Sequence, residues 1–180
     1  MRTGFSTWGH YVYAQQKRSL LDLDRVWSEV AEAGFLGIEI SWPLDQLQPP
    51  RVLRKQLDRY GLMAVSHWVN VTFAADCVDE AHEKAQFLRD VGGRVLVCEG
   101  VKQAGPMTKE QHCSLYRQFD AIGRVCEKQG ILAAFHFHRG CLETEDEVCE
   151  FFDNTEGVWF CPDIGHAAAL GWDPIPVIRE

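Results

Sequence analysis

The feature of this sequence that most constrains its fold is a regular alternation of short apolar runs with longer amphipathic runs. Runs rich in β-branched and aromatic residues predict strands at 3–8, 37–42, 62–68 and 94–99, a fifth that carries His136 and His138, and a sixth that ends at Asp163. Helical spacing of apolar residues predicts helices at 19–33, 50–60, 75–91, 108–129 and 144–152, and Pro174 begins another. Strict alternation of strands and helices predicts a parallel sheet with right-handed crossovers.

Two architectures place such units in a parallel sheet: the (β/α)₈ or TIM barrel and the open doubly wound sheet. Eight βα units usually need about 250 residues, whereas this sequence has 180 residues and six predicted strands. An open sheet would leave its first and last strands as bare edges. We therefore predict an α/β protein with one domain over 1–180, an incomplete TIM barrel of about six βα units whose C-terminal strands are missing. The open sheet is the alternative.

Charge and composition exclude several classes of protein. A formal net charge of -8 argues against binding to a nucleic-acid backbone. The sequence has no run of eighteen apolar residues that could span a membrane, and its first residues lack the apolar core of a signal peptide. Seven cysteines without a CxxC motif suggest reduced thiols. We expect a cytoplasmic protein, possible homo-oligomerisation, and no nucleic-acid or membrane partner.

Histidines and a carboxylate cluster at the ends of the fifth and sixth predicted strands. His136 and His138 are two residues apart and therefore share one strand face, while Phe135 and Phe137 point to the other face. Asp163 ends the next strand, and His166 follows in a turn loosened by Gly165. Imidazoles beside a carboxylate suit a divalent transition metal or a bound polyol. The alternative is a purely structural cluster, in which these side chains form hydrogen bonds with one another and bind no ligand.

Further polar and aromatic residues fall at the ends of the other predicted strands, where a barrel builds its active site. Glu99 is either a functional residue or a surface carboxylate at a strand end. Glu39 is either a functional residue or a member of a buried ion pair. His67 has either a functional or a structural role. Trp8, Trp42 and Trp68 either form apolar walls for a ring-shaped polyol or belong to the core. All of these positions lie at or near a strand end.

Several of these runs resemble a known group of enzymes. Residues 34–40, GFLGIEI, are similar to the second-strand signature of the xylose-isomerase-like sugar isomerase and epimerase superfamily. Residues 97–99, 135–140 and 163–166 resemble its inosose dehydratase branch. The resemblance implies a metal-dependent TIM barrel that acts on a small keto-polyol or sugar. His136 and Asp163 would match the metal ligands of strands five and six, although many relatives carry glutamate in place of His136.

The resemblance also implies roles for the remaining residues. His166 matches a histidine that contacts substrate, and Glu99, His138 and His166 are the candidates for proton transfer. Trp8, Glu39, Trp42 and His67 are the candidates for substrate binding. The cofactor would be a divalent ion such as Mn, Co, Mg or Zn. The ligands that the superfamily takes from strands seven and eight have no counterparts here, so this chain alone is expected to bind metal weakly.

Three functions follow from this resemblance. The leading one is an inosose dehydratase-like lyase of inositol catabolism, which abstracts a proton next to a carbonyl and expels water. A ketose isomerase or epimerase would instead return the proton. The third is a non-catalytic, truncated barrel that binds a sugar or a partner.

Overall fold

The computed structural model of this protein describes residues 3–17, 22–73, 76–101, 106–137, 141–142, 144–173 and 175. Its strands are β1 (Gly4–Ser6), β2 (Gly37–Ile40), β3 (Met63–Asn70), β4 (Val95–Glu99), β5 (Leu132–His136) and β6 (Val158–Phe160). Its α-helices are α1 (Trp8–Lys17), α2 (Leu23–Glu32), α3 (Pro50–Arg59), α4 (Asp76–Val91), α5 (Lys109–Lys128), α6 (Glu145–Asp153) and α7 (Ile164–Ala169). A short 3₁₀ helix, η1, covers Leu44–Gln46.

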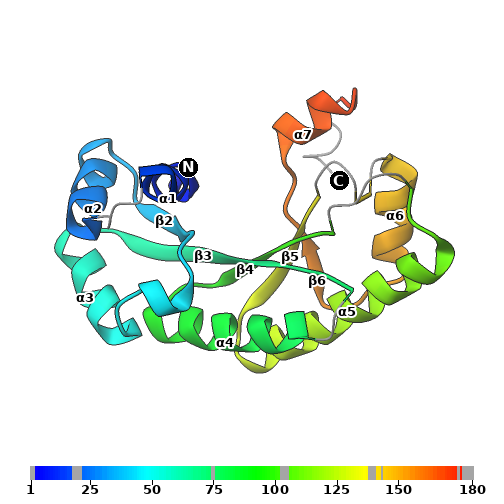
Figure 1. Cartoon of the computed structure of the whole chain (residues 1–180), viewed down its shortest axis with the longest axis horizontal. Coiled ribbons are helices and arrows are strands. Elements are labelled where there is room, and N and C mark those ends of the chain that lie inside the picture. Colours follow the sequence, from blue (N-terminus) through cyan, green and yellow to red (C-terminus); the bar gives the residue numbers. More distant parts are fainter. Residues whose placement is uncertain are drawn as a thin grey trace.

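All six strands form one parallel sheet in the order β1-β2-β3-β4-β5-β6. Figure 1 shows this sheet as a curved layer with α2 to α6 along its convex side and α1 and α7 above its two ends. A doubly wound sheet reverses its strand order at a switch point and carries helices on both faces. The sequential order and the one-sided helical layer are those of a TIM barrel, so the barrel prediction is confirmed.

Local sequence signals fix most element boundaries. Thr108 and Thr144, the residues at which two helices were predicted to begin, each form a capping box of α5 or α6 with the glutamine or glutamate three residues later. Pro50 occupies the first turn of α3, where its missing N–H costs no hydrogen bond. Gly130 follows α5 with a φ of 70°, which is the left-handed conformation that ends many helices.

The core lies between the sheet and the helices, and aromatic residues of β5 and α6 form a large part of it. The ring of Phe135 is 5.2 Å from that of Phe119 in α5 and 4.5 Å from that of Phe151 in α6. All three side chains are fully buried. The prediction that Phe135 and His136 point to opposite faces of the sheet is therefore confirmed.

The structure differs from the sequence-based assignment at both ends of the sheet. The first strand ends at Ser6 instead of Trp8, and α1 begins at Trp8 although no helix was predicted there. Only Ala14 of α1 is buried, so its sequence carries little periodic apolar signal. The sixth strand ends at Phe160, and Asp163 caps α7, which replaces the predicted turn at Gly165. The helix predicted from Pro174 lies outside the described residues. No helix within the described ranges is long and apolar enough to cross a membrane.

Candidate active site

A pocket of about 590 Å³ opens on the concave side of the sheet, at the carboxyl ends of the strands. Every strand contributes to it directly or through the residues that follow it. Its lining is formed by Ser6, Trp8, Glu39, Trp68, Asn70, Val97, Glu99, His136, Cys161, Pro162, Asp163 and His166. This is the face on which TIM barrels build their active sites.

Parallel pairing brings polar residues from three strands into one row. Asn70 of β3 is the register partner of Glu99 in β4, and Glu99 is the register partner of His136 in β5. Register partners on neighbouring strands share a sheet face, so an amide, a carboxylate and an imidazole stand side by side on the pocket wall. All three residues line the pocket.

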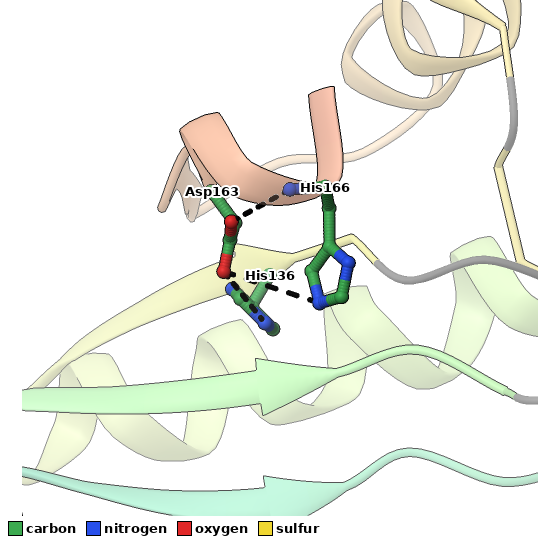
Figure 2. A group of neighbouring side chains, drawn as sticks. All are labelled: His136, Asp163 and His166. Atoms are coloured by element: carbon green, nitrogen blue, oxygen red, sulfur yellow. Dashed lines mark hydrogen bonds and ion pairs between the residues drawn. The ribbon is translucent and has the colours of Figure 1, made fainter. Parts of the chain in front are cut away.

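A second group at the pocket rim has the composition of a metal site. Figure 2 shows the side chains of His136, Asp163 and His166 converging from β5, the residues after β6 and α7. Asp163 Oδ2 lies 4.0 Å from His136 Nε2 and 3.9 Å from His166 Nε2. One donor atom from each residue lies within 4.8 Å of the other two. His166, predicted to contact substrate, therefore stands beside the two predicted ligands.

The Asp163 carboxylate is held in place by the helix that it caps. Its Oδ1 accepts a hydrogen bond of 2.8 Å from the backbone N–H of His166, and Oδ2 faces the two imidazoles (Figure 2). Burial raises the pKa of Asp163, but the N–H of His166 and the nearby imidazoles outweigh it, so the pKa lies below its usual value. Asp163 is therefore ionised at neutral pH, as a metal ligand must be.

These three donors are compatible with a divalent transition metal. Two imidazole nitrogens and one carboxylate oxygen are the ligand types that Zn²⁺, Mn²⁺ and Fe²⁺ accept, with positions left for substrate. The atoms are farther apart than hydrogen-bonding distance, which leaves room between them. Burial and the Glu39 and Asp163 carboxylates raise the pKa of the Cys161 thiol, which disfavours the thiolate form that would bind a metal.

Glu39 occupies the opposite part of the pocket and is held by two hydroxyl groups. Its Oε1 accepts a hydrogen bond of 2.7 Å from Ser6, and its Oε2 accepts one of 3.4 Å from Ser66. The register between β2 and β3 shifts at this point, so that Glu39 pairs with Ser66 instead of Val65. Glu39 thus forms no ion pair among the described residues, and its carboxylate faces the pocket.

The remaining wall is aromatic. Trp8, at the start of α1, and Trp68, in β3, meet edge to face with ring centroids 5.4 Å apart. Both rings line the pocket. They offer an apolar surface beside the polar row, which is the combination that binds a ring carrying both C–H and O–H groups.

Other predicted residues lie elsewhere. His67 faces the helical layer, where its ring is 6.4 Å from Phe87 of α4, because adjacent strand residues point to opposite faces. Trp42 is buried between Tyr11 and Trp27. Neither residue lines the pocket, although both border a smaller cavity of about 410 Å³ near α4. His138 lies outside the described residues.

Sequence reasoning missed two polar residues of the pocket, Ser6 and Asn70. Asn70 was overlooked because β3 was predicted to end at residue 68, two residues too early. Continuing the two-residue alternation from Trp68 would have placed Asn70 on the same face. Ser6 carried no comparable signal, since it lies in a strand of three residues.

Comparison with known proteins places this geometry in a family. The sequence profile of the xylose isomerase-like TIM barrel family matches residues 27–179. The chain belongs to that family. An inosose dehydratase from Geobacillus kaustophilus (strain HTA426) is 28% identical over 179 residues, a match that covers 87% of this chain and 58% of the relative. The chain thus spans less than two thirds of the length of this curated relative.

Solved structures agree on the fold. The IolI protein, in a crystal structure with a bound zinc atom, superposes with a TM-score of 0.77 at 17% identity, over 100% of this chain and 69% of that one. L-ribulose 3-epimerase superposes with a TM-score of 0.68 at 19% identity, over 82% of this chain and 56% of that one. At these identities the likeness concerns the fold alone.

Proposed function

We propose that this chain carries the metal and substrate site of a lyase that removes water from a keto-polyol related to inosose. The observation that carries the proposal is the convergence of His136, Asp163 and His166 at the rim of a pocket lined by further polar residues. The relationship to an inosose dehydratase supports the substrate class. The match spans 58% of that relative, so the dehydratase activity of the whole protein is itself proposed.

His136, Asp163 and His166 would hold the metal, since they supply two imidazole nitrogens and an ionised carboxylate. A divalent ion bound by them would act as a Lewis acid that stabilises negative charge developing at a substrate carbonyl oxygen. The zinc atom bound in the IolI structure supports a divalent ion as the cofactor.

Glu99 is our candidate for the general base. Its carboxylate lines the pocket in the row next to His136. It would accept the proton from the carbon next to the substrate carbonyl, and the electron pair of that C–H bond would move toward the carbonyl oxygen. Collapse of the resulting enediolate would expel the β-hydroxyl group, which would take the proton held by Glu99 and leave as water. The aromatic wall of Trp8 and Trp68 would hold the apolar face of the ring.

An epimerase of ketoses is the second candidate, and one observation favours it. Epimerisation needs a proton donor on the opposite side of the carbon from the base, and Glu39 supplies a second carboxylate in the same pocket. The likeness in fold to L-ribulose 3-epimerase is compatible with this chemistry. The two reactions share proton abstraction and differ in whether a hydroxyl group leaves.

Metal binding is tested with Asp163→Asn. Asparagine caps a helix as well as aspartate does, so α7 should persist while the ligand charge is lost. We expect Mn²⁺ or Zn²⁺ to bind the unmodified protein in calorimetry and the variant at least about 10-fold more weakly. Asp22→Asn is the matched control, because Asp22 caps α2 in the same way. Equal affinity of Asp163→Asn and Asp22→Asn would refute the metal assignment.

The reaction is tested with the metal-loaded protein. Water loss from keto-inositol and epimerisation of ketoses are assayed in parallel, and Glu99→Gln should lower the rate about 10²- to 10⁴-fold without changing metal affinity. Epimerisation without water loss would refute the dehydratase proposal. Metal binding with neither reaction would favour a non-catalytic sugar-binding barrel.

A further inference from the structure

Lys84 is a buried cation on α4, next to the apolar residues that this helix packs against the sheet. Its side chain is 9% exposed, whereas Ala81, Ala85 and Leu88 of the same helix are fully buried. Lysine is almost never buried unless its charge is paired. At the other buried positions of α4, apolar residues make the contact with the sheet. A charged residue is not needed for that contact, so the groups that surround Lys84 Nζ indicate the role of its charge.

The ammonium group of Lys84 acts on one residue of the sheet, Trp68. Nζ donates a hydrogen bond of 2.9 Å to the backbone carbonyl of Trp68 and lies 5.0 Å from the centre of its indole ring. The Glu80 carboxylate, one turn earlier in α4, lies 2.6 Å from Nζ. Glu80 is half-exposed, so this ion pair ties the cation to the rim of the helical layer.

A second buried side chain, that of His67, forms a hydrogen bond with the backbone N–H of Trp68. The N–H of Trp68 donates a hydrogen bond of 2.7 Å to Nδ1 of His67. Lys84 and His67 thus engage the carbonyl and the N–H of Trp68, while the Trp8 ring meets its indole edge to face. No other aromatic residue of the pocket has both backbone groups bonded to side chains among the described residues.

We propose that Lys84 is a positioning residue that fixes the indole of Trp68 as the aromatic wall of the pocket. Lys84 does not line the pocket and is not one of the three candidate metal ligands, although it borders the smaller cavity near α4 together with Trp68, so we assign it an effect on substrate through Trp68. Its hydrogen bond fixes the carboxyl end of β3, and its cation–π contact fixes the ring plane. A wall set in this way favours a substrate with a flat apolar face, such as a cyclic polyol, over an open-chain one. This substrate preference rests on the proposed function, whereas the positioning of Trp68 does not.

The proposal is tested by Lys84→Met, which keeps the unbranched apolar stem of the side chain and removes its charge, and by Lys84→Arg, which keeps both charge and donor. The indole N–H signal of Trp68 in a ¹H–¹⁵N spectrum is assigned by its loss in Trp68→Phe. We expect this signal to move in Lys84→Met and to stay close to its original position in Lys84→Arg. Lys17→Met is the matched control, because Lys17 also lies over an aromatic ring, that of Tyr13, but away from the pocket.

Binding of myo-inositol to the Mn²⁺-loaded protein gives the second measurement. We expect its dissociation constant to rise about 5- to 10-fold in Lys84→Met and less than about 2-fold in Lys84→Arg and Lys17→Met, with Mn²⁺ affinity constant. An unmoved Trp68 signal together with unchanged inositol affinity would overturn the proposal. If Lys84→Met fails to fold, Glu80→Gln decides, because loss of the exposed partner should also shift the Trp68 signal. Failure of the unmodified protein to bind inositol would count against the proposed function alone, since the Trp68 signal still reports the positioning.

Discussion

The buried ring of His67 should make the stability of this protein depend on pH. His67 is 1% exposed, and burial, assisted by the charge of Lys84, lowers its pKa from 6.5 to about 3. The backbone groups of Trp68 and Trp42 oppose this shift but do not offset it. Glu80 and Glu83 of α4 border the same cavity. The ring is therefore neutral in the folded protein at any pH above about 3.

The sign and size of the effect follow from this pKa. Between pH 6.5 and about 3 the unfolded chain binds a proton at His67 that the folded protein does not, so the free energy of unfolding falls as the pH falls. Each pH unit in this window costs about 1.4 kcal/mol. Lowering the pH from 7 to 5 crosses about one and a half units of the window, which predicts a loss of about 2 kcal/mol.

Urea denaturation followed by circular dichroism at pH 7 and pH 5 measures this loss. Other histidines and carboxylates also titrate, so the informative quantity is the difference in pH dependence between the unmodified protein and His67→Gln. We expect the variant to be less stable at pH 7 but to lose about 2 kcal/mol less on acidification. His82→Gln is the control, because His82 is exposed on α4. The same pH dependence in His67→Gln and the unmodified protein would refute the argument.

Three further predictions concern the helices and the metal site. Gly123→Ala should destabilise the protein by roughly 1–3 kcal/mol in urea denaturation, because a Cβ there would lie 3.0 Å from the Gly157 carbonyl oxygen. Gly9→Ala, where a Cβ meets nothing within 4 Å, should be neutral or stabilising, and equal losses at both sites would contradict the packing argument. Thr108→Ala should cost about 1 kcal/mol by opening the capping box of α5, and an unchanged urea midpoint would count against that cap. Mn²⁺ at about 100 times its dissociation constant should raise the free energy of unfolding by about 2.7 kcal/mol; EDTA or Asp163→Asn should abolish this gain, and its persistence in Asp163→Asn would place the ion elsewhere.

Elements with strong local signals were predictable from the sequence. The capping boxes at Thr108 and Thr144 and the proline at position 50 lie where the helices begin. The helices α1 and α7 were missed because each buries a single residue, Ala14 and Ala167, and therefore shows no apolar periodicity. The periodicity of apolar residues reveals a helix only where one of its faces is buried. Short helices with little buried surface, such as those at the rim of this sheet, are therefore the hardest to predict from sequence.

The site was predictable where one strand alone determined it. Alternation within β5 correctly separated His136 from Phe135. Asp163 was predicted at the end of the next strand; it lies beyond that strand as the cap of α7, and it is close to His136 as expected. Alternation extended through the whole of β3 would fail, because the register shift opposite Glu39 exchanges the two faces after Val65. A bulge depends on pairing with a neighbouring strand, so the sequence of β3 does not contain it.

That bulge has a functional consequence. Gly37 and Val65 are close neighbours, since a Cβ at Gly37 would lie 2.4 Å from Val65 Cγ2, which places Val65 on the concave face. Unbroken alternation from Val65 would then direct His67 into the pocket and Trp68 into the core. The inserted residue reverses this assignment: Trp68 joins the pocket, and His67 packs beneath it against α4. One irregularity in β3 thus places the buried, neutral ring of His67 beneath Trp68 and makes the indole of Trp68 part of the pocket wall.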